Sequence, residues 1–142
     1  MINKYWIRKL FILWELPQLV LGLFFLLFIS FKKPGSRKLR YKDADIYFVE
    51  GFPGGISLSG IIILNKIEAF IPDSDSIKSR HSVIHEYGHS IQSLWLGWLY
   101  LPLVGLPSLI RSIFWRKSKR ESRYYYERFP EHWADALGKR YI

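Results

Sequence analysis

Apolar residues are concentrated in two parts of the chain, residues 10–31 and residues 91–114. The first part is apolar over almost all of its 22 positions, which is long enough for a helix to cross a bilayer. Lys32 and Lys33 follow it, where a signal peptide would have the small residues of a cleavage site, and this favours an uncleaved anchor. We therefore expect a basic flank over residues 1–9 and a transmembrane helix over residues 10–31.

Between the two apolar parts, the pattern predicts short strands and then a helix. Residues 45–49 and 60–64 are rich in β-branched and aromatic side chains and are separated by glycines and a proline, as is typical of strands joined by tight turns. Several helix-capping residues follow at 72–76, and apolar residues then recur at helical spacing from about 76 to 96. We expect a small antiparallel or mixed sheet followed by one helix, within an α+β fold.

The second apolar part continues beyond this predicted helix. Four helix-breaking residues interrupt it, Gly97, Pro102, Gly105 and Pro107. We expect a re-entrant or interfacial hairpin over residues 91–114 or, as the alternative, an apolar core formed by residues 97–110. A short C-terminal helix is predicted from Pro130 to Leu137, because proline suits a first helical turn and Gly138 suits the end.

Composition narrows the classes of function. The chain has 142 residues, enough for one compact domain, which we expect over residues 32–142. The net charge is +9, and the basic residues adjoin the apolar parts, which favours contact with a lipid bilayer. None of the common nucleic-acid-binding motifs is present, so no nucleic-acid partner is expected. The chain has no cysteine, which excludes disulfides, thiolate metal ligands and a thiol nucleophile.

The predicted helix carries the sequence His85-Glu86-Tyr87-Gly88-His89, an H-E-x-x-H motif. Helix positions four apart share a face, so both imidazoles can reach one metal ion. Glu86 lies about 100° around the helix from His85, near enough to reach a metal-bound water. A zinc ion would lower the pKa of that water, and Glu86 would take its proton. The motif therefore predicts a catalytic zinc site, and the alternative is a pair of ordinary helix-surface histidines.

A catalytic zinc needs a third protein ligand. The candidates are His81, Glu121, Glu127, Glu131, His132 and Asp135. Glu131 stands out because Asp135 follows it at i+4 on the predicted C-terminal helix, so that one carboxylate can bind zinc and the other can accept a ring N–H from a ligand histidine. Glu127, one helical turn earlier, is the main rival ligand, and a solvated acidic face is the alternative for the pair.

H-E-x-x-H followed on a later helix by E-x-x-x-D resembles the gluzincin metallopeptidases, which include thermolysin. The resemblance implies one Zn²⁺ per chain, bound by His85, His89 and Glu131. It also implies that Glu86 is the general base and that Asp135 orients His85. The chain is much shorter than the large gluzincins and is more similar to a minimal, zincin-like version with added membrane segments. In that family an edge strand before the motif helix pairs with extended substrate.

The predicted site constrains how residues 91–114 can run. A single membrane crossing there would place His89 and Glu131 on opposite sides of the bilayer. A hairpin keeps both on one side, and the basic clusters that precede residue 41 and follow residue 115 favour the cytoplasmic side. We therefore expect an integral membrane protein with its catalytic domain in the cytoplasm.

These patterns predict a membrane-anchored zinc metalloendopeptidase that hydrolyses a peptide or protein substrate. Donors to the developing oxyanion would be needed besides the zinc. The candidates for this role are Tyr124, Tyr125, Tyr126 and His132. For the three tyrosines, packing or a place at a membrane interface is the simpler interpretation. The alternative function is a non-catalytic membrane-anchored protein with a structural metal site or an interaction role.

Overall fold

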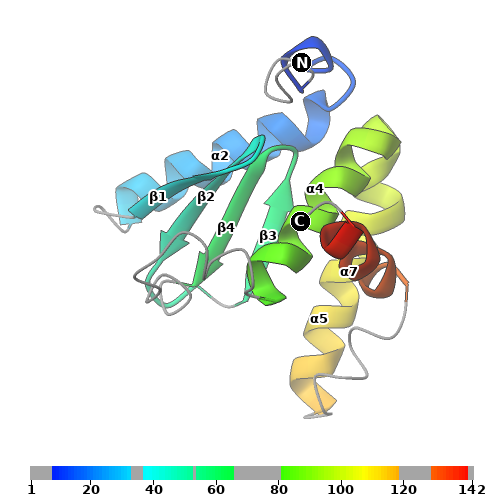
Figure 1. The fold of residues 1–142 in the computed structure, drawn as a ribbon. Coiled ribbons are helices and arrows are strands. Elements are labelled where there is room, and N and C mark those ends of the chain that lie inside the picture. The colour runs from blue at the N-terminus through cyan, green and yellow to red at the C-terminus, as the bar shows by residue number, and fades with distance from the viewer. Residues whose placement is uncertain (1–7, 33–36, 53, 66–80, 119–128, 141–142) are drawn as a thin grey trace.

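The computed structural model describes residues 8–32, 37–52, 54–65, 81–118 and 129–140 (Figure 1). The helices are α2 (Leu16–Lys32), α4 (His81–Leu96), α5 (Leu106–Ser118) and α7 (Glu131–Arg140). A 3₁₀ turn, η2 (Gly97–Leu99), and a π-helical turn, η3 (Leu101–Gly105), connect α4 to α5. The strands are β1 (Arg37–Tyr41), β2 (Ala44–Val49), β3 (Gly55–Leu58) and β4 (Ile61–Asn65).

The four strands form one mixed sheet in the order β1-β2-β4-β3. β1 and β2 form one antiparallel hairpin, β3 and β4 form another, and β2 and β4 pair in parallel. Two residues make each hairpin turn, since Tyr41 pairs with Ala44 and Leu58 pairs with Ile61. The protein is therefore α+β with a small mixed sheet, and β2 and β4 are the two strands that the β-branched runs predict.

Helices cover both faces of the sheet (Figure 1). Successive side chains of a strand point to opposite faces, so each central strand contributes to two buried clusters. On one face, strand residues pack with α4 and α7; this cluster includes Ile46, Phe48, Ile62, Tyr87 and Leu137. On the other face, strand residues pack with α2; this cluster includes Val49, Ile61, Ile63 and Ile29. The sheet thus lies between most of α2 and the helices that carry the two motifs.

The prediction of a transmembrane helix over residues 10–31 is wrong. A turn over residues 11–15 interrupts this stretch, and α2 begins only at Leu16 and has 17 residues. In the described part of the chain, none of the helices combines the length and the apolar character needed to cross a membrane. The expectation of an integral membrane protein with a cytoplasmic catalytic domain depended on this helix and is overturned with it.

Two polar residues explain why the apolar stretch does not form one continuous span. Glu15 accepts a hydrogen bond from the Ser93 hydroxyl of α4 at 2.6 Å. Gln18 donates to the same hydroxyl oxygen at 3.0 Å and to the carbonyl of Gly97 at 2.8 Å. Both polar side chains are buried, and these bonds attach the start of α2 to the end of α4. They satisfy one oxygen of Glu15 and the amide nitrogen of Gln18, which would be costly to leave unpaired in an apolar environment. The other Glu15 oxygen and the Gln18 amide oxygen have no hydrogen-bond partner among the described residues.

The chain reverses direction between α4 and α5, in the region where the sequence suggests a hairpin (Figure 1). Gly97 adopts a φ of +56°, and a methyl group at this position would lie 2.3 Å from the indole ring of Trp14. Only glycine combines this backbone conformation with so close an approach. Tyr100 and Val104 of the connection are buried. The reversal returns the chain toward α7, so the two motifs can meet.

Candidate metal centre

The candidate site lies where α4 and α7 cross at close distance. A methyl group on Gly88 would lie 1.8 Å from the carbonyl oxygen of Ala134, and one on Gly138 would lie 2.0 Å from that of Ile84. The two helices therefore touch backbone to backbone at two glycines. Gly88 lies inside the H-E-x-x-H motif, and its missing side chain is what brings the first turn of α7 against the histidines.

Three polar atoms converge at this crossing. The Nε2 atoms of His85 and His89 lie 2.8 Å and 3.0 Å from the same oxygen, Oε2 of Glu131. The exposed fractions of these residues are 3%, 4% and 0%. One ligand atom from each of them lies within 4.8 Å of the others, an arrangement that can hold a metal ion. The structure thus brings together the residues that the two motifs single out as ligands.

Each histidine has a second partner on its other ring nitrogen. Nδ1 of His85 lies 2.8 Å from Oδ1 of Asp135, and Nδ1 of His89 lies 2.7 Å from Oε1 of Gln92. The Gln92 amide donates to the carbonyl of Pro130, which turns its oxygen toward His89. Asp135 and Gln92 thus each place an acceptor oxygen at an Nδ1 atom, so each ring can donate outward from Nδ1 while its Nε2 faces the cluster.

The remaining oxygen of Glu131 also has a partner, since the Ser108 hydroxyl of α5 donates to Oε1. Neither Ser108 nor Gln92 is among the residues that the sequence singles out. Gln92 has a local signal, because it lies three residues after His89 and shares its helix face. Ser108 has no such local signal, because it lies 23 residues from Glu131 and only the tertiary structure brings the two side chains together.

The charges of the cluster are strongly coupled. Burial on its own would lower the pKa of His85, but its hydrogen bonds to Asp135 and Glu131 raise the pKa to about 9. Burial would raise the pKa of Glu131, but the hydrogen bonds to His85 and His89 hold it well below its usual range. At neutral pH, a proton is therefore held between a cationic ring and a carboxylate. A divalent cation at the same place would displace that proton.

Glu86 points to the sheet side of the site, next to β3. A methyl group on Gly55 would lie 2.5 Å from Oε1 of Glu86, so the strand backbone passes directly beside this carboxylate. Burial raises the pKa of Glu86, although the nearby His89 and His85 oppose this effect. Among the described residues, its buried Oε2 has no hydrogen-bond partner. The carboxylate is thus held beside the cluster without belonging to it.

The described part of the chain contains two of the other predicted candidates, His132 and His81. His132 follows Glu131 on α7 but is exposed. His81 is the first residue of α4. Five candidates, Glu121, Glu127, Tyr124, Tyr125 and Tyr126, lie outside the described residues.

Comparison with protein-family models, with curated proteins and with solved structures finds no match to this chain. The functional inference therefore rests on the geometry of the cluster and its surroundings.

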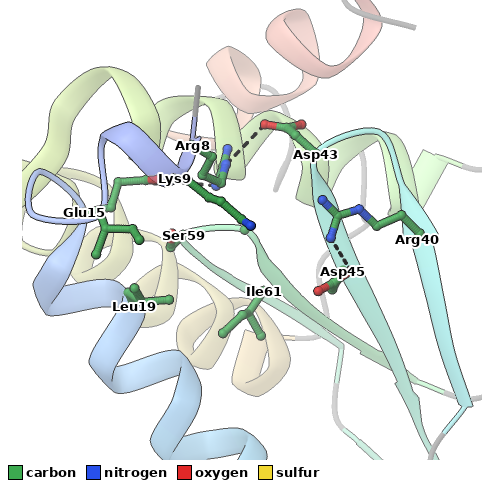
Figure 2. A pocket seen from close by; sticks show the side chains of 11 residues that line it. Arg8, Lys9, Glu15, Leu19, Arg40, Asp43, Asp45, Ser59 and Ile61 are labelled. Atoms are coloured by element: carbon green, nitrogen blue, oxygen red, sulfur yellow. Dashed lines mark hydrogen bonds and ion pairs between the residues drawn. The ribbon is translucent and has the colours of Figure 1, made fainter. Parts of the chain in front are cut away.

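A separate pocket of about 190 Å³ lies between the N-terminal segment and the sheet (Figure 2). Its charged side chains bind one another: Arg8 pairs with Asp43 at 3.1 Å, and Arg40 pairs with Asp45 at 2.7 Å. Arg8 also donates to the carbonyl of Ser90, one residue after the second motif histidine. Arg8 thus attaches the N-terminal segment to the β1–β2 hairpin and to α4, and the Arg40–Asp45 pair joins β1 to β2, so the role of these contacts is structural.

Proposed function

We propose that this protein is a zinc-dependent metallopeptidase of the gluzincin type. The observation that carries the proposal is the convergence of His85 Nε2, His89 Nε2 and Glu131 Oε2 at a buried point. The carboxylate of Glu86 beside this point supports the catalytic part of the proposal. No other described cluster of histidine and acidic residues has this arrangement.

The donor set fits zinc. Two imidazole nitrogens and one carboxylate oxygen are the three protein ligands of many catalytic zinc sites, in which water takes the fourth position. Bonds of about 2.0 Å in tetrahedral geometry place neighbouring ligand atoms about 3.3 Å apart. The Oε2 atom of Glu131 lies 2.8 Å and 3.0 Å from the two nitrogens. To accept the ion, these two separations would lengthen by a few tenths of an ångström, and the ligand atoms, which lie within 4.8 Å of one another, would draw together around it.

Glu86 would move the protons of the reaction. The zinc ion, when bound, supplies polarisation of the scissile carbonyl and acidification of a water. Glu86 would accept the proton of that water and then donate it to the leaving amine. Its buried position raises its pKa, which brings the carboxylate closer to the range where it can both accept and return a proton. Asp135 and Gln92 would keep the two histidines in the required tautomer.

The sheet offers a place for an extended peptide. β3 is the terminal strand of the described sheet, and it is the strand next to Glu86. A substrate chain can add to such an edge through main-chain hydrogen bonds, which would align its peptide groups with the metal centre. We propose peptide or protein segments in extended conformation as the substrate class.

The proposal is tested by measuring bound metal in the purified protein by mass spectrometry. We expect about one zinc ion per chain, and its loss in His85→Ala and in Glu131→Ala. His132→Ala is the matched control, because this exposed neighbour of Glu131 takes no part in the cluster. A folded wild-type protein that binds no zinc even after zinc is added back would overturn the proposal.

A structural metal site without catalysis is the second candidate function. The burial of all three ligand residues favours it, because structural sites are closed and catalytic sites keep an open position. The two candidates differ in the consequence of losing Glu86. A structural site predicts an unchanged protein, whereas the peptidase predicts a loss of turnover with zinc retained.

A further inference from the structure

Glu131 uses its two oxygens differently. Oε2 faces both histidine nitrogens, while Oε1 accepts a hydrogen bond from the hydroxyl of Ser108. Ser108 belongs to α5, a helix outside both motifs, and is separated from Glu131 by 23 residues. Glu131 is completely buried, so its carboxylate has little freedom to find other partners. The hydrogen bond from the Ser108 hydroxyl therefore helps to fix the orientation of the Glu131 carboxylate.

We propose that Ser108 is a positioning residue that holds Glu131 as a one-oxygen metal ligand. This inference rests on the proposed metal site. A carboxylate can bind a metal ion through one oxygen or through both. A hydroxyl bonded to Oε1 keeps that oxygen away from the ion and directs Oε2 toward it. The coordination position that a second oxygen would take is thereby left for water or for a substrate carbonyl.

The same arrangement is present at the other two ligands. Asp135 holds the outer nitrogen of His85, and Gln92 holds the outer nitrogen of His89. With Ser108 on Glu131, each of the three ligand residues has a partner of its own that is not a ligand. Such outer partners fix the orientation of metal ligands and contribute to affinity. Ser108 completes this set from a third helix.

The connection between α4 and α5 thus has a role beyond joining the two motifs. The Tyr100 hydroxyl donates to the carbonyl of Ser57 in β3 at 2.8 Å, and Val104 is completely buried. These contacts attach the connection to the strand beside Glu86 and to the core. The connection that leads to Ser108 is therefore held in place, as a hydroxyl that positions another side chain requires.

The inference is tested by metal titration of the folded protein and by the visible absorption spectrum of its Co²⁺ form. We expect Ser108→Ala to weaken zinc affinity by about ten- to a hundredfold and to change the Co²⁺ spectrum, because Glu131 then binds through both oxygens. Ser108→Thr keeps the hydroxyl and should restore both readouts. Ser112→Ala, the same substitution one turn later on α5, should leave both unchanged.

The possible outcomes separate this inference from the proposed function. Wild-type protein that binds neither ion would overturn the metal site itself. Wild-type protein that binds zinc, with Ser108→Ala equal to Ser112→Ala in affinity and spectrum, would overturn only the role of Ser108. If Ser108→Ala does not fold, Ser108→Thr and Ser108→Val decide the question, since they have the same shape and differ in the hydroxyl. Equal affinity in that pair would contradict the inference.

Discussion

Two buried glutamates lie near the same pair of histidines, yet their surroundings shift their pKa values in opposite directions. Hydrogen bonds to His85 and His89 keep the pKa of Glu131 low, in spite of its burial. Glu86 has no such bonds from the rings, and its burial raises its pKa. A ligand must stay ionised, whereas a general base must gain and return a proton. The difference supports the proposed roles, with Glu131 as a metal ligand and Glu86 as the general base.

This difference predicts the effect of Glu86→Gln. The variant should keep its zinc, because Glu86 is not one of the three converging ligands. It should lose peptide hydrolysis by about 10²- to 10⁴-fold, the usual contribution of a positioned acid or base. The measurement is zinc content together with turnover of a fluorogenic peptide library.

Glu131→Gln is the matched control for this prediction, since the same change at the neighbouring carboxylate should remove zinc and turnover together. Loss of zinc from Glu86→Gln would show that Glu86 is a ligand. Full turnover in that variant would leave the structural metal site as the function.

At the scale of elements, the crossing of α4 and α7 determines how close Glu131 lies to the two histidines. The backbones of Gly88 and Ala134 are in direct contact, and so are those of Gly138 and Ile84. Each glycine lowers the helix propensity of its own helix. This cost is offset by a separation that lets Glu131 reach both histidines.

We expect Gly88→Ala to disrupt this crossing. The new methyl group would overlap the carbonyl of Ala134, and since this neighbour is backbone, the helices must move apart. The free energy of unfolding should fall by about 2–3 kcal/mol, and zinc affinity should fall with it. Urea unfolding with and without zinc measures both effects.

Gly105→Ala is the comparison for Gly88→Ala, because a methyl group there would lie 3.4 Å from a leucine side chain, at ordinary contact distance. It should leave stability and zinc affinity nearly unchanged. Equal effects of the two substitutions would contradict the importance of the crossing.

Arg8 attaches the N-terminal segment to α4, the helix that carries the two histidines. This buried side chain pairs with Asp43 and Glu15 (Figure 2) and also donates to the carbonyl of Ser90 on α4. Arg8→Ala would leave two carboxylates buried without their cation, so the free energy of unfolding should fall by about 3–5 kcal/mol. The exposed neighbour Lys9 provides the control, and Lys9→Ala should change the free energy of unfolding by at most about 1 kcal/mol, because interactions of exposed charges contribute little.

Thermal unfolding of the two variants measures this difference. A melting temperature of Arg8→Ala equal to that of Lys9→Ala would show that the ion pairs do not stabilise the fold.

Local pattern was sufficient to predict some elements and not others. The two β-branched runs and the helical spacing around His85 and His89 are local signals, and they correspond to β2, β4 and α4. The spacing of Glu131 and Asp135 is local too, and both residues contact His85. These predictions depended only on residues close together in the chain.

Long-range contacts account for what the sequence did not predict. The length and apolar character of residues 10–31 predict a membrane span in spite of the polar residues Glu15 and Gln18. Their partners, Ser93 and Gly97, are more than seventy residues away, and no local pattern indicates them. Ser108 was missed for the same reason.

At the scale of the whole molecule, large apolar side chains remain exposed on α2 and α5. On α2, the exposed fractions of Phe24, Phe28 and Phe31 are 66%, 54% and 80%. Lys9 and Lys32, near the two ends of this region, are exposed as well. With a net charge of +9, this combination of apolar and basic side chains is complementary to an anionic lipid surface. We therefore propose a lipid surface as a partner of α2.

The proposal predicts that the protein sediments with vesicles of mixed phosphatidylglycerol and phosphatidylcholine, and less with phosphatidylcholine alone or at high salt. Phe24→Ser with Phe28→Ser should weaken this binding, because the apolar part of the contact is removed while the charge is kept. Lys139→Ser, an exposed change on α7, should not weaken it. Wild-type protein that stays in the supernatant with every vesicle, and is monodisperse in buffer, would contradict the role given to this face.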